Sequence, residues 1–442
     1  MTGGEAMIRL LALLLLLLFA VPARAAPPAP DTAALEARFA GDAARHVRDL
    51  YDLYSKRGVT SPKMSDATIA DVAAYLAEQR DDSSPGYPEG SAVLFYAHQG
   101  DRLAIYLIGR QGIIAFHETR VTPEDLRAAS AYYRIDLDVD GIARSRAPVW
   151  TGKGAQPPAP VVSASSADRK TPITDILLPP AIRTALLDVR HLVIVAGGVI
   201  ATNPFAAFPL TDTEQLVDRM SLTVSAGLFD LDQMIRPWRG KSEFAGLLVV
   251  GDPRVPASPD WRVPPLPGAA KEARMLAERA GVPALIGAEA TKAAVMDQMS
   301  SAGMLYFAAH GVSNPRSPLD GGYLMLAGPS PAEAFLAAGE VQQMDLSADL
   351  AVLSACKSGL GFAHDAGVIG LARAFQKAGV PRVVMSLWSV SDEATLYLMD
   401  RFQLHAMDHV PAEALRLAML DTRKIHPDPA LWAPFTMFGT PR

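Results

Sequence analysis

The stretch Asp349-Leu350-Ala351-Val352-Leu353-Ser354-Ala355-Cys356-Lys357-Ser358-Gly359 is an apolar run that ends in a cysteine and a polar turn. A second run, Met304-Leu305-Tyr306-Phe307-Ala308-Ala309-His310-Gly311, ends as abruptly in histidine and glycine. Short continuous apolar runs between turn residues are typical of strands buried on both faces, as in a parallel sheet. Ligands bind beyond the carboxyl ends of such strands. We therefore expect His310 and Cys356 at one edge of one sheet.

The chain around these two runs alternates between strand-like and helix-like segments. Further strands are expected at 192–196, 246–250, 382–388 and 436–438, and a hairpin through 323–326. Helices are expected from about residues 268, 291, 331, 392 and 411, and another contains Val368, Leu371, Ala372 and Phe375 and ends at Gly379. This alternation predicts an α/β fold, a mostly parallel sheet with helices on both faces.

The first part of the chain has a different pattern. Apolar residues at helical spacing predict a helical N-terminal segment over 26–85. Strands at 92–97, 102–108 and 113–117 predict an antiparallel β-meander, and Thr122-Pro123-Glu124-Asp125 has the capping residues of a helix start. The predicted organisation is a signal peptide (1–25), the helical segment (26–85), the meander plus helix (86–146), a Pro/Ala/Ser-rich linker (147–170) and the α/β domain (171–442).

The first 25 residues have the order of a secretory signal peptide. Arg9 precedes an apolar run over 10–21, and small residues follow, which predicts cleavage after Ala25. The alternative is a retained membrane anchor, for which the run is short. We therefore expect an exported, periplasmic or extracellular protein without a membrane span after cleavage.

Composition narrows the choice of chemistry. Lysine and arginine number 41 against 47 aspartates and glutamates, so a net charge of −6 gives no basic surplus for nucleic acid. Cys356 is the only cysteine, so an internal disulfide is ruled out. A single cysteine in an exported protein indicates a reactive thiol or an intermolecular pairing, and the alternative is a small buried apolar side chain.

A thiol beside an imidazole suits acyl transfer. The imidazole takes the thiol proton, the thiolate attacks a carbonyl carbon, and backbone N–H groups stabilise the oxyanion. The amides of Gly311 and Cys356 are candidates for that oxyanion hole. His310 lies 46 residues before Cys356, and in caspases the histidine lies about 50 residues before an Ala-Cys pair. His364 is a rival base. This chemistry needs neither a metal nor an organic cofactor.

The residues from about 170 onward resemble a CHAT domain, of the caspase-like cysteine peptidase clan with separases and gingipains. The resemblance rests on 191–195 with 204–208, Gly251-Asp252-Pro253, 266–269 with 272–273, 307–311, 353–359, 370–375, 386–392 and 432–439. It implies a caspase-like sheet, His310 as general base and acid, and Cys356 as nucleophile. The family usually has Glu-Thr-Gly after the cysteine, where this chain has Lys357-Ser358-Gly359. Tetratricopeptide repeats often precede the domain, and residues 32–80 show none.

The resemblance also implies where substrate specificity is set. In this clan the strand after the cysteine block, around its tryptophan, lines the specificity pocket, which here implicates Trp388, Asp392 and Ser354. Asp392 can accept an arginine or lysine side chain; alternatively, it stabilises the N-terminus of its own helix.

We thus expect an exported cysteine endopeptidase with a Cys356–His310 dyad. Its partners are a protein or peptide substrate and a regulatory protein as a further candidate. The alternative is a CHAT-like scaffold that binds protein partners without cleaving them.

Overall fold

The computed structural model describes residues 32–55, 67–77, 87–137, 149–150, 171–228, 238, 240, 244, 246–258, 261–312, 322–354, 362–364, 367–388 and 391–440. Its residues fall into two compact units, Met1–Arg38 and Phe39–Arg442. The sheet and the candidate site lie in the second unit. The predicted signal peptide, most of the predicted linker and Cys356 lie outside the described residues.

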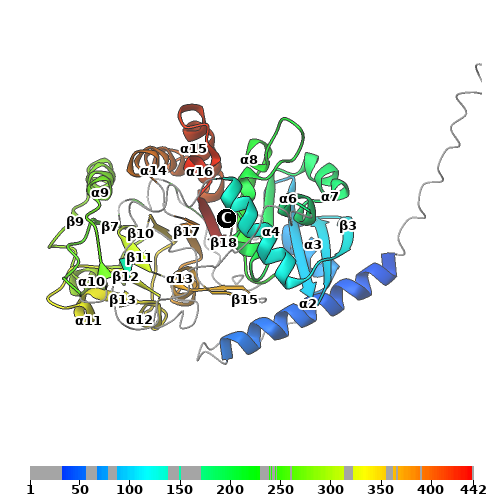
Figure 1. Ribbon diagram of the computed structural model, residues 1–442, viewed down its shortest axis with the longest axis horizontal. Coiled ribbons are helices and arrows are strands. Elements are labelled where there is room, and N and C mark those ends of the chain that lie inside the picture. The colour runs from blue at the N-terminus through cyan, green and yellow to red at the C-terminus, as the bar shows by residue number, and fades with distance from the viewer. Residues whose placement is uncertain are drawn as a thin grey trace, which may run out of the picture. The chain divides into compact units, whose positions relative to one another are not determined.

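An eleven-stranded sheet forms the centre of the second unit (Figure 1). Its order is β3-β2-β1-β5-β6-β18-β17-β14-β10-β7-β9. The strand bounds are β1 Ser91–Gln99, β2 Arg102–Gly109, β3 Gly112–Arg120, β5 His191–Val195, β6 Ser221–Ser225, β7 Leu247–Gly251, β9 Ala284–Ile286, β10 Met304–Ala308, β14 Leu350–Leu353, β17 Arg382–Ser386 and β18 Phe435–Gly439.

The part of the sheet that carries the two apolar runs is parallel. β10 lies between β7 and β14, and β14 pairs in the same direction with β17. All residues of β7, β10, β14 and β17 are buried. Strands covered on both faces need continuous apolar sequence, and for this reason the apolar runs predict these strands. The predicted α/β fold with a mostly parallel sheet is confirmed.

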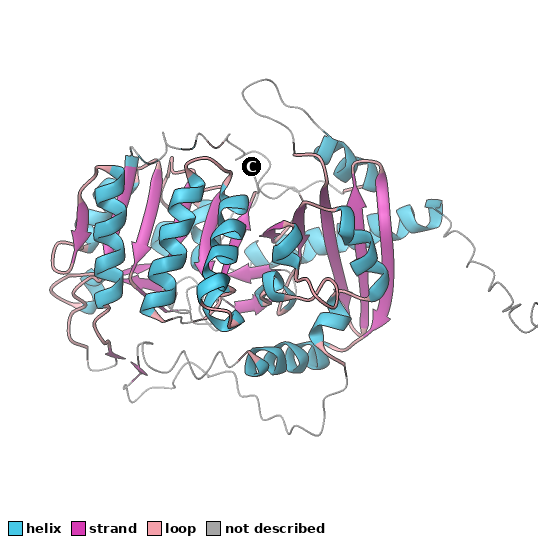
Figure 2. Cartoon of the chain, turned by 90° about the horizontal axis from the view of Figure 1, so that it is seen from above, coloured by secondary structure: helices cyan, strands magenta, loops and turns pink. Residues whose placement is uncertain are grey.

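Helices cover both faces of this part of the sheet, with α9, α14 and α15 above it and α10, α12 and α13 below it in Figure 1. Figure 2 shows helices that run roughly alongside the strands they cover. The helix bounds are α2 Thr32–Ser55, α3 Ile69–Ala77, α4 Pro123–Asp136, α6 Ile173–Leu177, α7 Pro180–Ala185, α8 Leu216–Arg219, α9 Pro267–Ala280, α10 Lys292–Met299, α11 Pro331–Ala334, α12 Ala338–Val341, α13 Leu371–Lys377, α14 Asp392–Ala406, α15 Pro411–Ile425 and α16 Pro429–Trp432. No helix of the described chain combines the length and the apolar character needed to cross a bilayer.

The predicted meander is present, and it belongs to the same sheet. β1, β2 and β3 are antiparallel neighbours, and β1 also pairs in parallel with β5, from Ser91↔His191 to Phe95↔Val195. The following helix α4 begins as its sequence predicts, because the Thr122 side chain accepts a hydrogen bond from the Asp125 N–H. The meander and the α/β segment therefore share one continuous array of strands.

One predicted element differs from the structure, and the place of another in the sheet was not predicted. The helix expected around Val368 begins at Leu371, and Val368 instead lies in β16 (Gly367–Ile369), which pairs with β15 (Phe362–His364). The last strand, β18, is present as expected and lies inside the sheet, a place that its sequence does not predict: it runs antiparallel to β17 and meets β6 in parallel at a single register pair, Phe438↔Val224. A strand's partners are chosen by distant segments, so its local sequence does not report its place in a sheet.

Candidate active site

Strands β10 and β14 bring the two predicted catalytic segments to one edge of the sheet. Their last register pair is Phe307↔Leu353. Three residues beyond Phe307 lies His310, and three residues beyond Leu353 in the sequence comes Cys356. Cys356 itself lies outside the described residues. The described strand ends, Phe307 and Leu353, thus lie side by side at the carboxyl ends of adjacent parallel strands, where ligands bind in such sheets.

His310 begins a small separate strand rather than ending β10. It opens β11 (His310–Val312), which pairs with β12 (Tyr323–Met325) and through it with β13 (Phe335–Ala337). The side chain is 2% exposed, and its Nε2 lies 2.6 Å from the carbonyl oxygen of Pro264. A carbonyl oxygen only accepts, so Nε2 carries the hydrogen. In the neutral ring Nδ1 is then the basic nitrogen.

Gly311, the predicted oxyanion-hole residue of the histidine segment, follows directly in β11. It is buried and lies opposite Leu324 in the register of β11 and β12. The small sheet therefore holds the backbone on the carboxyl side of the imidazole. Cys356, the other predicted oxyanion-hole residue, is not among the described residues.

Ser354 ends the described part of the cysteine segment and is tied to the core beneath it. Tyr306, on β10, is 1% exposed and donates a hydrogen bond to Glu272 of α9, a side chain that is 2% exposed. Burial raises the pKa of Tyr306 well above its ordinary value, the Glu272 carboxylate raises it further, and a hydrogen bond with Ser354 opposes the rise. The phenol therefore stays protonated and links α9 to the end of β14. Ser354 was predicted as a pocket residue, and this contact faces the core.

Trp388 is packed into the protein interior. It is 1% exposed, and its indole N–H donates to the carbonyl of Ala430 at 2.9 Å. The guanidinium of Arg134, from α4, lies 5.8 Å from the indole ring centre, and its Nη2 donates to the Leu387 carbonyl at 3.2 Å. Helix α4 thus contacts the predicted specificity segment through Arg134.

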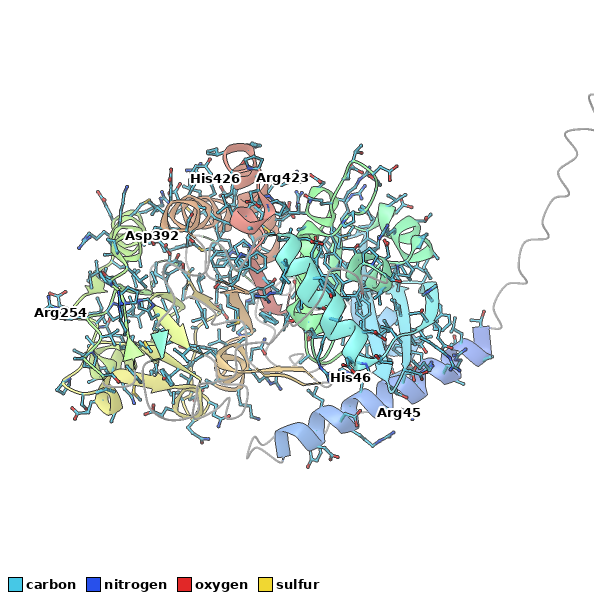
Figure 3. The ribbon with its side chains drawn as sticks, in the orientation of Figure 1. Arg45, His46, Arg254, Asp392, Arg423 and His426 are labelled. Atoms are coloured by element: carbon cyan, nitrogen blue, oxygen red, sulfur yellow. The ribbon has the colours of Figure 1, made fainter. Side chains whose placement is uncertain are left out.

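Asp392 is the first residue of α14 (Figure 3). It is half-buried and lies against the first turn of α9, because a Cβ on Gly268 would come within 2.4 Å of its Cγ. Two helix N-termini therefore face this carboxylate, and their partial positive charge favours an anion there. This placement supports the helix-terminus interpretation, and the pocket role of Asp392 stays a prediction.

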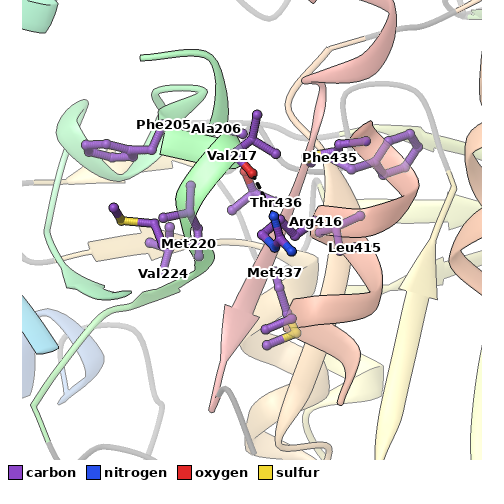
Figure 4. Close-up of a pocket in the computed structure, with 13 residues that line it drawn as sticks. Phe205, Ala206, Val217, Met220, Val224, Leu415, Arg416, Phe435, Thr436 and Met437 are labelled. Atoms are coloured by element: carbon purple, nitrogen blue, oxygen red, sulfur yellow. Dashed lines mark hydrogen bonds between the residues drawn. The ribbon is translucent and has the colours of Figure 1, made fainter. Parts of the chain in front are cut away.

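A separate apolar pocket lies where β6 meets β18 (Figure 4). Its lining is Phe205, Ala206, Val217, Met220, Leu222, Val224, Ala412, Leu415, Arg416, Met419, Phe435, Thr436 and Met437. Arg416 crosses it from α15 and donates to the Val217 carbonyl at 3.2 Å. Among the described residues of this lining there is no histidine or cysteine. The pocket therefore lies between β6 and β18, and its lining contains none of the predicted site residues.

Three residues of the candidate site were missed by sequence reasoning. Pro264 acts through its backbone carbonyl, and no side-chain pattern reports such a role. Arg134 comes from a helix for which the sequence predicts only the capped start at Thr122. Tyr306 lies inside an apolar run that predicts only a strand, although a tyrosine hydroxyl in a buried strand indicates a hydrogen-bond partner elsewhere in the core.

Comparisons with known proteins identify the family and the fold of the chain. A family model described as the CHAT domain matches residues 170–440. Tetratricopeptide repeat protein 28 of Mus musculus and its counterpart of Homo sapiens are each 26% identical to the chain over 296 residues, covering 57% of this chain. The chain spans 12% of the length of these curated relatives.

Two solved structures were also compared. A chain of the Saccharomyces cerevisiae separase–securin complex superposes with a TM-score of 0.54 at 10% identity, covering 94% of this chain and 34% of that chain. The Arg specific cysteine proteinase gingipain R gives a TM-score of 0.42 at 11% identity, covering 61% of this chain and 70% of that chain. The family model covers more than half of the chain, and the protein therefore belongs to the CHAT domain family, with a caspase-like α/β fold.

Proposed function

We propose that this protein is an exported cysteine endopeptidase in which Cys356 is the nucleophile and His310 the general base and acid. The observation that carries the proposal is the hydrogen bond from His310 Nε2 to the Pro264 carbonyl. It commits the neutral ring to the tautomer whose Nδ1 accepts a proton. A histidine held this way, at the sheet edge that the cysteine segment shares, is suited to activate a thiol.

The reaction follows from these roles. The Cys356 thiol passes its proton to His310 Nδ1, and the sulfur attacks the carbonyl carbon of the substrate peptide bond. The oxyanion of the tetrahedral intermediate accepts hydrogen bonds from the Gly311 and Cys356 amides. The intermediate collapses as the C–N bond breaks and the imidazolium gives its proton to the leaving amine. Water then attacks the thioester, His310 takes its proton, and the C–S bond breaks to return the thiol.

The test uses the fact that Cys356 is the only cysteine. We expect iodoacetamide to alkylate the folded wild-type protein rapidly at pH 7. The mass of the intact protein monitors the reaction. Because a free thiol has a pKa near ~8.5, the His310→Ala variant should react about tenfold more slowly. A Cys356→Ala variant controls for labelling elsewhere, and a His364→Ala variant tests the rival base. A peptide library incubated with wild type and Cys356→Ala then reports cleavage.

The alternative function is a scaffold that binds proteins without cleaving them. Its support is the 26% identity to Tetratricopeptide repeat protein 28, which is named for repeats that form binding surfaces, although residues 32–80 of this chain show no such repeat. A thiol that is inert in the folded protein, with no library peptide cleaved, would favour this alternative and contradict the peptidase.

Three further parts of the proposal are separable from the dyad. Export rests on the signal-like first 25 residues and is tested by N-terminal sequencing of protein recovered outside the cytoplasm. A preference for basic residues rests on Asp392. A regulatory protein partner is suggested by separase, whose structure was solved with securin, and a pull-down with Cys356→Ala protein tests it.

A further inference from the structure

The Gly251-Asp252-Pro253 motif has no part in the acyl-transfer scheme, yet it lies beside the histidine. Gly251 ends β7 directly under α9, where a Cβ would lie 2.3 Å from the Cβ of Ala273. Only glycine allows that approach. Asp252 follows with a φ of 42°, the one non-glycine residue of the described chain with positive φ. For a residue other than glycine this conformation is unfavourable, and aspartate and asparagine tolerate it best.

Asp252 makes two hydrogen bonds that bracket His310. Its N–H donates to the carbonyl of Ala308 at 2.9 Å, two residues before the histidine. Its Oδ1 accepts from the N–H of Leu266 at 2.8 Å, two residues after Pro264. Pro264 supplies the carbonyl that accepts from His310 Nε2. One residue thus joins the strand that leads to the imidazole and the segment that holds it.

We infer that Asp252 is a positioning residue for His310: it fixes the Pro264 carbonyl against Nε2 and so selects the tautomer whose Nδ1 is basic. This inference deepens the proposed peptidase function and rests on it for its catalytic consequence. The unusual backbone of Asp252 turns its carboxylate toward Leu266 while its N–H stays on Ala308, and both contacts depend on that turn.

The competing explanation is that Asp252 only secures the start of α9, since Leu266 is the N-cap residue of that helix. Loss of the carboxylate would then lower the free energy of unfolding and leave the imidazole unchanged. The two explanations differ in what happens to the ring nitrogens of His310, which stability measurements do not report.

Two substitutions separate the carboxylate from the backbone conformation. Asp252→Asn keeps a side-chain acceptor oxygen and tolerates positive φ, whereas Asp252→Gly keeps the backbone freedom and removes the acceptor. Each is prepared as the full chain with ¹⁵N-labelled histidine rings, and the His310 signal is assigned by its absence from a His310→Asn spectrum. The NMR readout does not require peptidase activity.

We expect His310 in wild type and Asp252→Asn to be mainly the Nε2–H tautomer, and in Asp252→Gly to become a mixture. Alkylation of Cys356 at pH 7 should fall in Asp252→Gly by less than the about tenfold expected for His310→Ala, because the imidazole is misoriented and not removed, and it should recover in Asp252→Asn. An unchanged tautomer in folded Asp252→Gly, with only a lower melting temperature, overturns the inference. If wild-type alkylation proves independent of His310, the peptidase proposal fails, while the tautomer spectra still decide the role of Asp252.

Discussion

Two histidines, one in each part of the sheet, occupy matching positions. His98 in β1 lies three residues after Phe95, whose register partner in the parallel neighbour β5 is Val195. His310 lies three residues after Phe307, whose register partner in the parallel neighbour β14 is Leu353. Both rings place Nε2 on a backbone carbonyl, of Val121 at 2.9 Å and of Pro264 at 2.6 Å.

The difference lies in the neighbouring strand. Three residues beyond Val195 the sequence has Gly198, and three residues beyond Leu353 it has Cys356. β1 also continues into a hairpin, since His98 lies opposite Leu103 of β2. A histidine whose Nε2 lies on a backbone carbonyl thus occurs in both parts of the sheet. The proposed chemistry depends on which residue the adjacent strand delivers beside it.

The largest expected effect tests that contrast. Replacing His310 by alanine should lower kcat/KM for peptide cleavage by about 10²–10⁴-fold, the range for loss of a general acid–base group. The matched His98→Ala variant should change it by less than about twofold. A comparable loss in His98→Ala, measured on protein with an unchanged melting temperature, would contradict the division of roles.

The next effect concerns the predicted specificity segment, residues 386–392. It begins at the end of β17, in the part of the sheet that leads to His310. Asp392→Ala should lower kcat/KM for peptides cleaved after arginine by about 10- to 100-fold relative to those cleaved after leucine, the scale of a lost hydrogen bond to a charged group. The helix-terminus role alone predicts a loss of about 0.3–1 kcal/mol in the free energy of unfolding with the preference unchanged. Equal cleavage of both peptide sets therefore removes Asp392 from the pocket.

The contact between helices α8 and α15 should depend on pH. Asp218 of α8 pairs with Arg423 of α15, which also donates to the Gln215 side chain at 3.0 Å. Burial raises the pKa of Asp218, but hydrogen bonds from Arg423 and from the Gln215 N–H outweigh it and hold the pKa below its ordinary value. The carboxylate therefore stabilises the fold above pH ~4 and loses this contribution as pH falls through the lowered pKa.

We accordingly expect Asp218→Asn to lower the free energy of unfolding by about 1–3 kcal/mol at pH 7. The difference in the free energy of unfolding between the variant and wild type should shrink as the pH falls from about 4 to the lowered pKa. Urea unfolding at each pH measures it. Asp212→Asn, at an exposed position four residues after Phe208, is the control and should change little. A difference that stays constant with pH would mean that the carboxylate charge is not what joins α8 to α15.

The smallest effect concerns the support that α4 gives to the specificity segment. Arg134→Leu removes the guanidinium over Trp388 and the bond to the Leu387 carbonyl, which should cost about 1–2 kcal/mol. The exposed Arg127 of the same helix provides the control, Arg127→Leu. If both variants melt at the wild-type temperature, α4 does not brace this segment.

The parts of the fold that the sequence predicted share one property: their signal is local. β10 and β14 are buried on both faces, so their residues are continuously apolar and their ends are marked by polar residues. α4 has its cap, and α13 ends where Gly379 takes a φ of 115°. The meander is readable because its turns separate neighbouring strands.

What could not be predicted depends on distant partners. The central place of β18 is set by β6 and β17, and the role of Pro264 is set by where the segment before α9 passes. Val368 fits the helical spacing of Leu371 and Phe375, yet the chain places it in a hairpin with β15. For the site, the sequence singled out His310, Gly311, Ser354, Trp388 and Asp392, but the residues that hold them act through backbone groups and through contacts across the sheet.

The interior position of β18 has a consequence for biosynthesis. Its neighbours β6 and β17 are made first, and until Phe435–Gly439 has emerged each has an unsatisfied edge of backbone N–H and C=O groups. Such edges readily join strands of other molecules. Nascent chains that stall before this segment should therefore be prone to aggregate and to need a chaperone, whereas synthesis of Phe435–Gly439 lets one short strand pair with both edges.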